Sequence, residues 1–220
     1  MNILVFLGST RQSQPPKPPR LGSRVATALV AHFRESYPDD EIELIDPLDY
    51  DLGEVFKPHF AYASGRAPEP LAALADRIRE AGAYVMVSPE YNHSLSPALA
   101  HLLNHFGSSR YAYKPSLIVT YSAGQWGGVR AAVGMRTFLS ELGCLPVSAM
   151  VHVPHAAEVL DDEGRYRDDE GAERWRTYLQ RGSTQLRWWA EAARRQREEA
   201  DPHTLIGDFT REPRQRDAPG

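Results

Sequence analysis

The sequence predicts an α/β fold in which five parallel strands lie between two layers of helices. Short apolar runs alternate with segments of helical periodicity, and this alternation is typical of βαβ units. The crossovers of such units are right-handed and build a parallel sheet. Several predicted strands end in polar turns rich in Gly and Ser, where open α/β sheets bind their ligands.

Each of the five strands is predicted from an apolar or alternating run bounded by turn-forming residues. They span residues 2–7, 41–46, 83–87, 116–121 and 147–153. This set suits a three-layer sandwich with the flavodoxin-like strand order 2-1-3-4-5. A six-stranded dinucleotide-binding sheet would need more strands than the chain supplies.

Five helices are predicted from apolar residues at helical spacing. They span residues 22–33, 71–82, 97–106, 129–142 and 171–200. Ser96 suits the N-cap of the third helix, with Pro97 at its first helical position. Gly143 suits a left-handed cap at the end of the fourth.

The chain of 220 residues is expected to form one flavodoxin-like domain over residues 1–200, with a mobile C-terminal tail over 201–220. Residues 12–20 are rich in Pro and are expected to form an extended or mobile loop. The long last helix carries three Trp residues that we expect to pack on the sheet or on a partner subunit, namely Trp175, Trp188 and Trp189.

Composition argues against several kinds of partner. A net charge of −4 and a pI of about 6.1 give no electrostatic basis for binding nucleic acid or an acidic membrane. No apolar run approaches the ~18 residues of a membrane span, and the N-terminus lacks the basic segment of a secretory signal. Cys144 is the single cysteine and is expected to be buried and inert. We therefore expect a cytoplasmic protein.

Two histidines stand at helical spacing without a complete metal-ligand set. His101 and His105 are four residues apart, but a metal would need a further ligand beside them. We expect no metal site here and both imidazoles on the helix surface or at a dimer contact.

The first polar turn combines groups that hold a phosphate. Ser9 and Arg11 follow the first strand, and Arg20 and Ser23 stand at the start of the next helix. Hydroxyls, guanidinium groups and the N–H groups of a helix N-terminus bind phosphate together. The alternative is an N-capped helix with solvated arginines. Neither a P-loop nor a Gly-x-Gly-x-x-Gly pattern is present.

The second and third turns suit a flat heterocycle. Pro89, Glu90, Tyr91 and Asn92 offer backbone groups and flat contact surface, although Glu90 and Asn92 could instead satisfy nearby backbone groups. In the third turn, the glycines of the segment 122–128 let the backbone approach a ligand. A phosphate at the first turn and a flat ring between the other two describe bound FMN.

Three segments carry a resemblance to a known family, the NADPH-dependent FMN reductases. They are Gly8-Ser9-Thr10-Arg11, Pro89-Glu90-Tyr91-Asn92-His93-Ser94 and residues 122–131. The resemblance covers roughly residues 1–155 and implies a flavodoxin-like fold, bound FMN, and NADPH or NADH as co-substrate. It also implies a homodimer or homotetramer with flavin sites near subunit interfaces.

The resemblance also assigns roles to the residues of the three turns. Ser9 and Arg11, joined by Arg20 and Ser23, would bind the FMN phosphate. The isoalloxazine would lie against Pro89, Glu90, Tyr91 and Asn92, and it would be closed on its other side by Ser122 and Gly124.

The predicted function is an oxidoreductase that passes hydride from NAD(P)H through FMN to a quinone-like or other small electron acceptor, or that supplies reduced flavin. Hydride transfer needs no protein acid or base, so no catalytic residue is assigned. The alternatives are a non-enzymatic, flavodoxin-type electron carrier and a binding module with or without FMN.

The chain departs from the family pattern in the helix after the second turn. The segment Leu99-Ala100-His101-Leu102-Leu103-Asn104 lacks the Lys and Asp that are frequent in the family, and we expect this difference to alter the dimer contacts.

Overall fold

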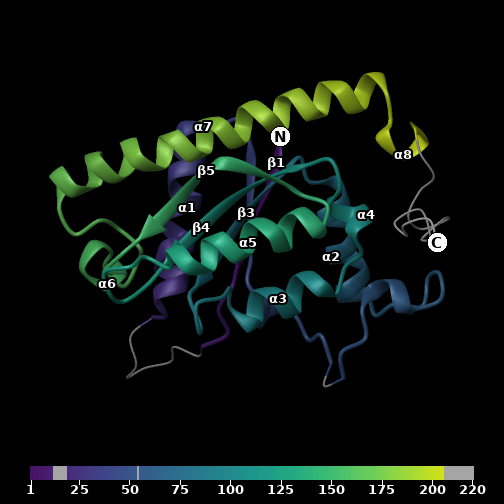
Figure 1. Cartoon of the computed structure of the whole chain (residues 1–220), viewed down its shortest axis with the longest axis horizontal. Helices are drawn as coiled ribbons and strands as arrows, with labels where there is room; N and C mark the ends of the chain where they lie inside the picture. The colour runs from purple at the N-terminus through teal and green to yellow at the C-terminus, as the bar shows by residue number, and fades with distance from the viewer. Residues whose placement is uncertain (12–18, 54, 206–220) are drawn as a thin grey trace.

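The computed structural model describes residues 1–11, 19–53 and 55–205. Its five strands form one parallel sheet in the order β2-β1-β3-β4-β5, as the sequence predicts (Figure 1). The strands are β1 (Asn2–Leu7), β2 (Glu41–Ile45), β3 (Ala83–Pro89), β4 (Pro115–Tyr121) and β5 (Leu145–Val153).

The strand register aligns the carboxyl ends of the three central strands. Leu7 of β1 pairs with Val87 of β3, and Pro89 of β3 pairs with Tyr121 of β4. The turns that follow these strands therefore leave the sheet at the same edge, which is where a parallel sheet binds ligands.

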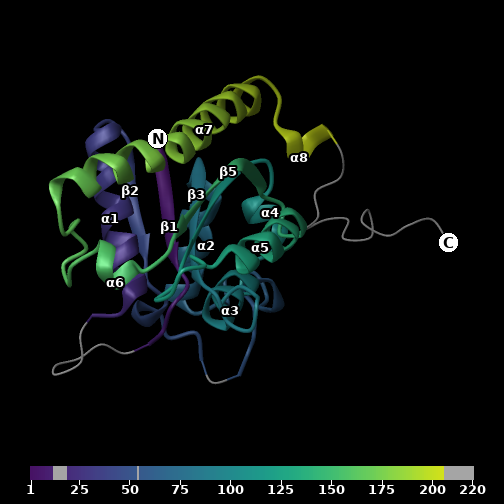
Figure 2. The same ribbon diagram turned by 60° about the vertical axis from the view of Figure 1, so that its left-hand side comes forward.

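Helices cover both faces of the sheet (Figures 1 and 2). One face carries α1 (Leu21–Ser36) and α7 (Asp169–Glu199), and the other carries α2 (Glu69–Glu80), α3 (Pro97–Asn104), α4 (Ser108–Tyr111) and α5 (Val129–Glu141). Shorter helices are α6 (Ala156–Val159), α8 (Pro202–Leu205) and the 3₁₀ turns η1 (Pro47–Asp49) and η2 (His59–Ala61).

Successive side chains of a strand point to opposite faces of the sheet, and this alternation produces one hydrophobic core on each face. Ile3, Val5 and Leu7 pack on the face of α1 and α7, whereas Leu4 and Phe6 pack on the face of α2 and α3. All five are fully buried. Each such side chain contributes roughly 1.5–3 kcal/mol through burial, so both faces are strongly specified.

Most predicted element bounds agree with the structure within about two residues. Cys144 is buried, and Gly143 has a φ of 101°, as expected. Residues 155–169 are not a simple polar loop: they contain α6 and bury Ala156 and Leu160 against the core. Trp175 packs against the core, whereas Trp188 and Trp189 stay exposed.

The prediction for the paired histidines is wrong for His105. Its side chain is fully buried, and its Nδ1 lies 2.8 Å from the carbonyl oxygen of His101. Phe56 covers it, with 4.7 Å between the ring centroids. Tertiary packing of the loop after β2 buries this position, which helical periodicity does not reveal.

Two segments that the sequence predicts to be mobile lie mostly outside the residues that the structure describes. Residues 12–18 of the Pro-rich loop and residues 206–220 of the tail are not among the described residues. No helix in the described ranges is long and apolar enough to cross a membrane.

Candidate functional site

Backbone contacts hold the turn after β1 against β3. The Gly8 N–H donates to the Val87 carbonyl at 2.7 Å. A Cβ on Gly8 would lie only 2.6 Å from that oxygen, so this approach requires glycine.

Ser96 connects the first turn with the second. Its hydroxyl donates to the Gly8 carbonyl at 2.6 Å and accepts from the Leu99 N–H at 3.0 Å, so the residue also caps α3. The Ser96 N–H donates to the Ser88 hydroxyl at 2.9 Å. The sequence predicts the capping role, but the link to Gly8 spans 88 residues and no local pattern signals it.

The predicted phosphate-binding residues gather at the start of α1. The buried Arg20 guanidinium donates to the Ser9 carbonyl and forms an ion pair with Asp46. The Ser23 hydroxyl donates to the Arg20 carbonyl at 2.8 Å. Burial lowers the pKa of Arg20. Arg11, in contrast, is exposed at the end of the turn.

The N-terminus of α1 can accept an anion. No side chain of the described residues caps it, and its first turn holds no acidic residue. Backbone N–H groups and the helix dipole therefore favour a negative group here, beside Ser9 and Arg11.

Tyr121 is a residue of the site that no sequence pattern reveals. It ends β4, and its buried hydroxyl interacts with Ser9. Gly22 leaves room for this hydroxyl, because a Cβ there would overlap it. Burial raises the pKa of Tyr121, so the hydroxyl remains a donor at neutral pH. The spacing of β4 predicts a buried residue at position 121 but not what its hydroxyl contacts.

The second turn presents an exposed aromatic ring. Tyr91 and Ser94 exchange two backbone hydrogen bonds, of 3.0 and 2.9 Å, around Asn92 and His93. Both central residues have positive φ, 49° and 60°, as in a type I′ turn. This tight turn leaves the Tyr91 side chain 47% exposed at the strand ends.

Glu90 ties the second turn to α5. Its carboxylate accepts from the Arg130 N–H at 3.1 Å, the Arg130 guanidinium at 2.9 Å and the Ala131 N–H at 3.4 Å. Burial opposes the charged form, but these hydrogen bonds outweigh it and lower the pKa of Glu90. Its side chain is therefore engaged by protein groups, which leaves the backbone of the turn to face a ligand.

The third turn is closed by Ser122. Its hydroxyl donates to the Gly124 carbonyl at 2.6 Å and accepts from the Gly127 N–H at 2.9 Å. Gly128 has a φ of 78° and starts α5. A Cβ on Gly124 would meet no atom within 4 Å, so open space borders this position.

An exposed aromatic residue also stands beside the third turn. The Trp126 side chain is 57% exposed, and the Arg130 guanidinium lies 5.1 Å from the centroid of its ring. With Tyr91 on the second turn, the site carries a flat apolar surface on two turns and an anion-accepting helix start on the first. Among the described residues, no group of three or more His, Cys, Asp or Glu could hold a metal ion.

A family model described as NADPH-dependent FMN reductase matches residues 1–158. An NAD(P)H-dependent FMN reductase from Pseudomonas aeruginosa is 30% identical over 123 residues, which cover 54% of this chain and 66% of the relative. A quinone reductase from Pseudomonas putida is 29% identical over 107 residues, covering 46% and 57%. The chain thus spans less than two thirds of the length of these relatives.

Solved structures share the fold at low sequence identity. A flavoenzyme NAD(P)H:(acceptor) oxidoreductase from Paracoccus denitrificans superposes with a TM-score of 0.62 at 20% identity, covering 84% of this chain and 97% of that one. The apo form of an NADH:FMN oxidoreductase has a TM-score of 0.61 at 16% identity, with 87% and 89% covered. These likenesses agree with the sheet order described above.

Proposed function

We propose, because this chain belongs to the NADPH-dependent FMN reductase family, that it binds FMN at the three turns and passes hydride from NADPH or NADH to a small acceptor such as a quinone. The observation that carries the proposal is the meeting of the three turns at one edge of the sheet. An anion-accepting helix start lies on one side, and exposed aromatic residues lie on the other.

The residues at the first turn fit the phosphate of FMN. Arg11 is the exposed cation, while Arg20 is occupied by Asp46 and the Ser9 carbonyl. We infer that Arg11, Ser9 and the N-terminus of α1 contact the phosphate and that Arg20 and Ser23 shape the turn.

The second and third turns fit the isoalloxazine ring. In this arrangement Pro89, Tyr91 and Asn92 line one side, and Ser122 and Gly124 close the other. The engaged carboxylate of Glu90 keeps the second turn in place through α5. Bound FMN would supply the hydride chemistry, and the chain's part is to orient the ring and exclude water from one of its faces.

We also propose a homodimer or homotetramer, as in the family, and a reducing compartment such as the cytoplasm. The single buried thiol of Cys144 supports the second inference, because it offers no partner for an internal disulfide.

Absorbance and kinetics of the full-length protein test the function. We expect the purified protein to take up FMN with about one equivalent per chain and to oxidise NADPH or NADH steadily when a quinone is added. Anaerobic NAD(P)H should bleach the flavin bands. A protein that cannot take up FMN contradicts the proposal, and FMN uptake without NAD(P)H oxidation would indicate an electron carrier instead.

A further inference from the structure

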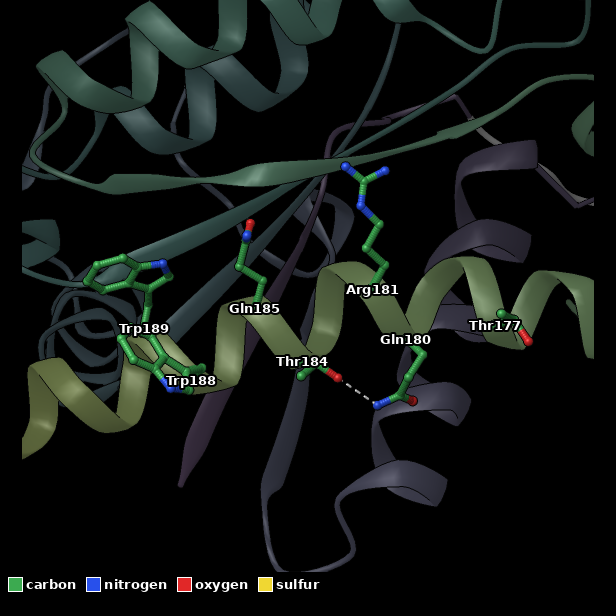
Figure 3. Close-up of a pocket in the computed structure, with 7 residues that line it drawn as sticks. All are labelled: Thr177, Gln180, Arg181, Thr184, Gln185, Trp188 and Trp189. Carbon is green, nitrogen blue, oxygen red and sulfur yellow. Dashed lines mark hydrogen bonds between the residues drawn. The ribbon is translucent and has the colours of Figure 1, made fainter.

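The outer face of α7 is uncovered within the described part of the chain. Leu179, Leu186 and Ala190 bury the inner face on the sheet. An open groove of about 670 Å³ runs along the opposite side (Figure 3). It is lined by Thr177, Gln180, Arg181, Thr184, Gln185, Trp188 and Trp189. Trp188 is 62% exposed, which is unusual for a Trp on a helix already packed on a core.

The outer face carries a stripe with a strict seven-residue period. Steps of four and three residues alternate along it, a period of 3.5 that places all its members on the side opposite the buried residues. We call this set the α7 stripe: Glu170, Arg174, Thr177, Arg181, Thr184, Trp188, Glu191 and Arg195. It spans roughly 37 Å at 1.5 Å per residue.

The α7 stripe is complementary to itself in the antiparallel direction. If a second copy runs the opposite way about an axis between residues 182 and 183, Glu170 faces Arg195 and Arg174 faces Glu191. Thr177 then faces Trp188, so a small side chain opposes the largest one. The same pairs recur at the other end by symmetry, which gives four contacts of opposite charge.

We propose that the α7 stripe is an interface between two copies of this chain, packed antiparallel about a twofold axis. This inference adds a contact surface to the oligomer of the proposed function and does not depend on the redox chemistry. The seven-residue period suits the shallow crossing of two packed helices, with side chains projecting alternately to either side of the seam. In Figure 3, Arg181 and Trp189 project to one side of α7, and Thr184 and Trp188 to the other.

Contacts at the centre of the proposed helix pair would give partners to two exposed side chains, Arg181 and Trp188. Arg181 has no hydrogen-bond or ion-pair partner among the described residues. In the antiparallel pair, Arg174 and Arg181 of one copy lie on either side of Trp188 of the other, where a guanidinium can stack on the indole. The end charges are already paired within each helix, with Arg174–Glu170 and Arg195–Glu191 both at 2.8 Å. Two such pairs would meet as an alternating square of charges.

Exchanging charges within the α7 stripe of the full-length protein tests whether this surface forms the interface and whether the two helices run antiparallel. One variant combines Glu170→Arg with Arg174→Glu, and a second combines Glu191→Arg with Arg195→Glu. Each keeps an opposite-charge pair within the helix, so helix content should hold, but each places like charges at both ends of its own dimer. The variants mixed with each other restore every pair. The control exchanges Arg79 and Glu80 on α2, which are similarly exposed.

Sedimentation over roughly 1–100 µM protein measures the assembly, because a single helix pair lies at the weak end of specific interfaces. We expect each α7 exchange, and Trp188→Glu, to raise the dissociation constant at least about tenfold, and the mixture to recover wild-type association. The α2 control should behave as wild type.

A wild-type monomer at all concentrations overturns the proposal, as does assembly that the α7 exchanges leave unchanged. Failure of the mixture to recover overturns it too, since the register requires recovery. Sedimentation is measured without flavin, so the oligomeric state that it reports does not depend on whether the protein binds FMN.

Discussion

Glu90 and Arg130 join the second turn of the candidate site to the N-terminus of α5. The carboxylate accepts from both the backbone N–H and the guanidinium of Arg130, although 40 residues separate the two in sequence. The turn that carries Tyr91 is therefore held by the helix that follows the third turn. This carboxylate therefore adds a side-chain link between the two turns where the ring of FMN is proposed to lie.

We expect Glu90→Gln to lower the free energy of unfolding by about 1–2 kcal/mol at pH 7, because charge-assisted hydrogen bonds become neutral ones. The folded pKa of Glu90 lies below its ordinary value of 4.5, so its stabilisation is complete above that pH and is lost as pH falls through the folded pKa. The difference between wild type and variant in urea unfolding should thus shrink below about pH 4. Glu80→Gln, at an exposed position on α2, serves as the control. A difference that stays constant down to pH 3 would contradict the role of the charge.

Arg11 and Arg20 should respond differently to mutation. Arg11→Gln removes an exposed cation, so we expect FMN affinity to fall about tenfold or more with little change in stability. Arg20→Met leaves Asp46 without its buried partner and should lower the free energy of unfolding by about 3 kcal/mol. Fluorescence titration with FMN and urea unfolding measure the two effects. Loss of stability in Arg11→Gln without loss of affinity would reverse these roles.

The sequence predicts the sheet order and the location of the site because both depend on local patterns. Apolar runs such as residues 2–7 and 83–87 define the strands, and the polar turns after them define the ligand edge. The N-cap at Ser96 is predicted for the same reason, since the Ser-Pro pair is a local signal.

Side-chain partners distant in the chain could not be predicted in this way. Tyr121 reaches across to Ser9, and Glu90 reaches Arg130, and neither contact follows from periodicity. The sequence predicts His105 on the helix surface or at a dimer contact, but Phe56 from an irregular loop covers it. Such contacts depend on the path of loops, which hydrophobic spacing does not encode.

Tyr121→Phe removes one hydroxyl at the start of α1 and should act on the phosphate end of the ligand. We expect FMN affinity to fall roughly three- to tenfold, while affinity for riboflavin, which lacks the phosphate, stays unchanged. Tyr91→Ala, at the proposed ring, should instead weaken FMN and riboflavin alike. Flavin fluorescence titrations measure all four affinities. An equal loss of both ligands in Tyr121→Phe would place its hydroxyl away from the phosphate.

Lys114 directly precedes β4, at the end of the strand opposite the candidate site. Its side chain links the C-terminal ends of α2 and α4. Its buried ammonium donates to the carbonyls of Ile78 at 2.8 Å, Arg79 at 2.5 Å and Arg110 at 3.0 Å. Burial lowers its pKa to about 7, against an ordinary value of 10.5. Between these values the unfolded chain holds a proton that the folded chain has released, so this group makes the free energy of unfolding rise with pH.

Lys114→Met should therefore do two things. It leaves the helix-end carbonyls without their donor, and we expect a loss of about 2–3 kcal/mol at pH 7. It also removes the titrating group, so the stability of wild type relative to the variant should increase from pH 7 to pH 10. Urea unfolding across this range measures both, with Lys57→Met as the control at an exposed lysine. A difference independent of pH would mean that Lys114 keeps its ordinary pKa, and that the three carbonyl acceptors stabilise the ammonium as well as water does.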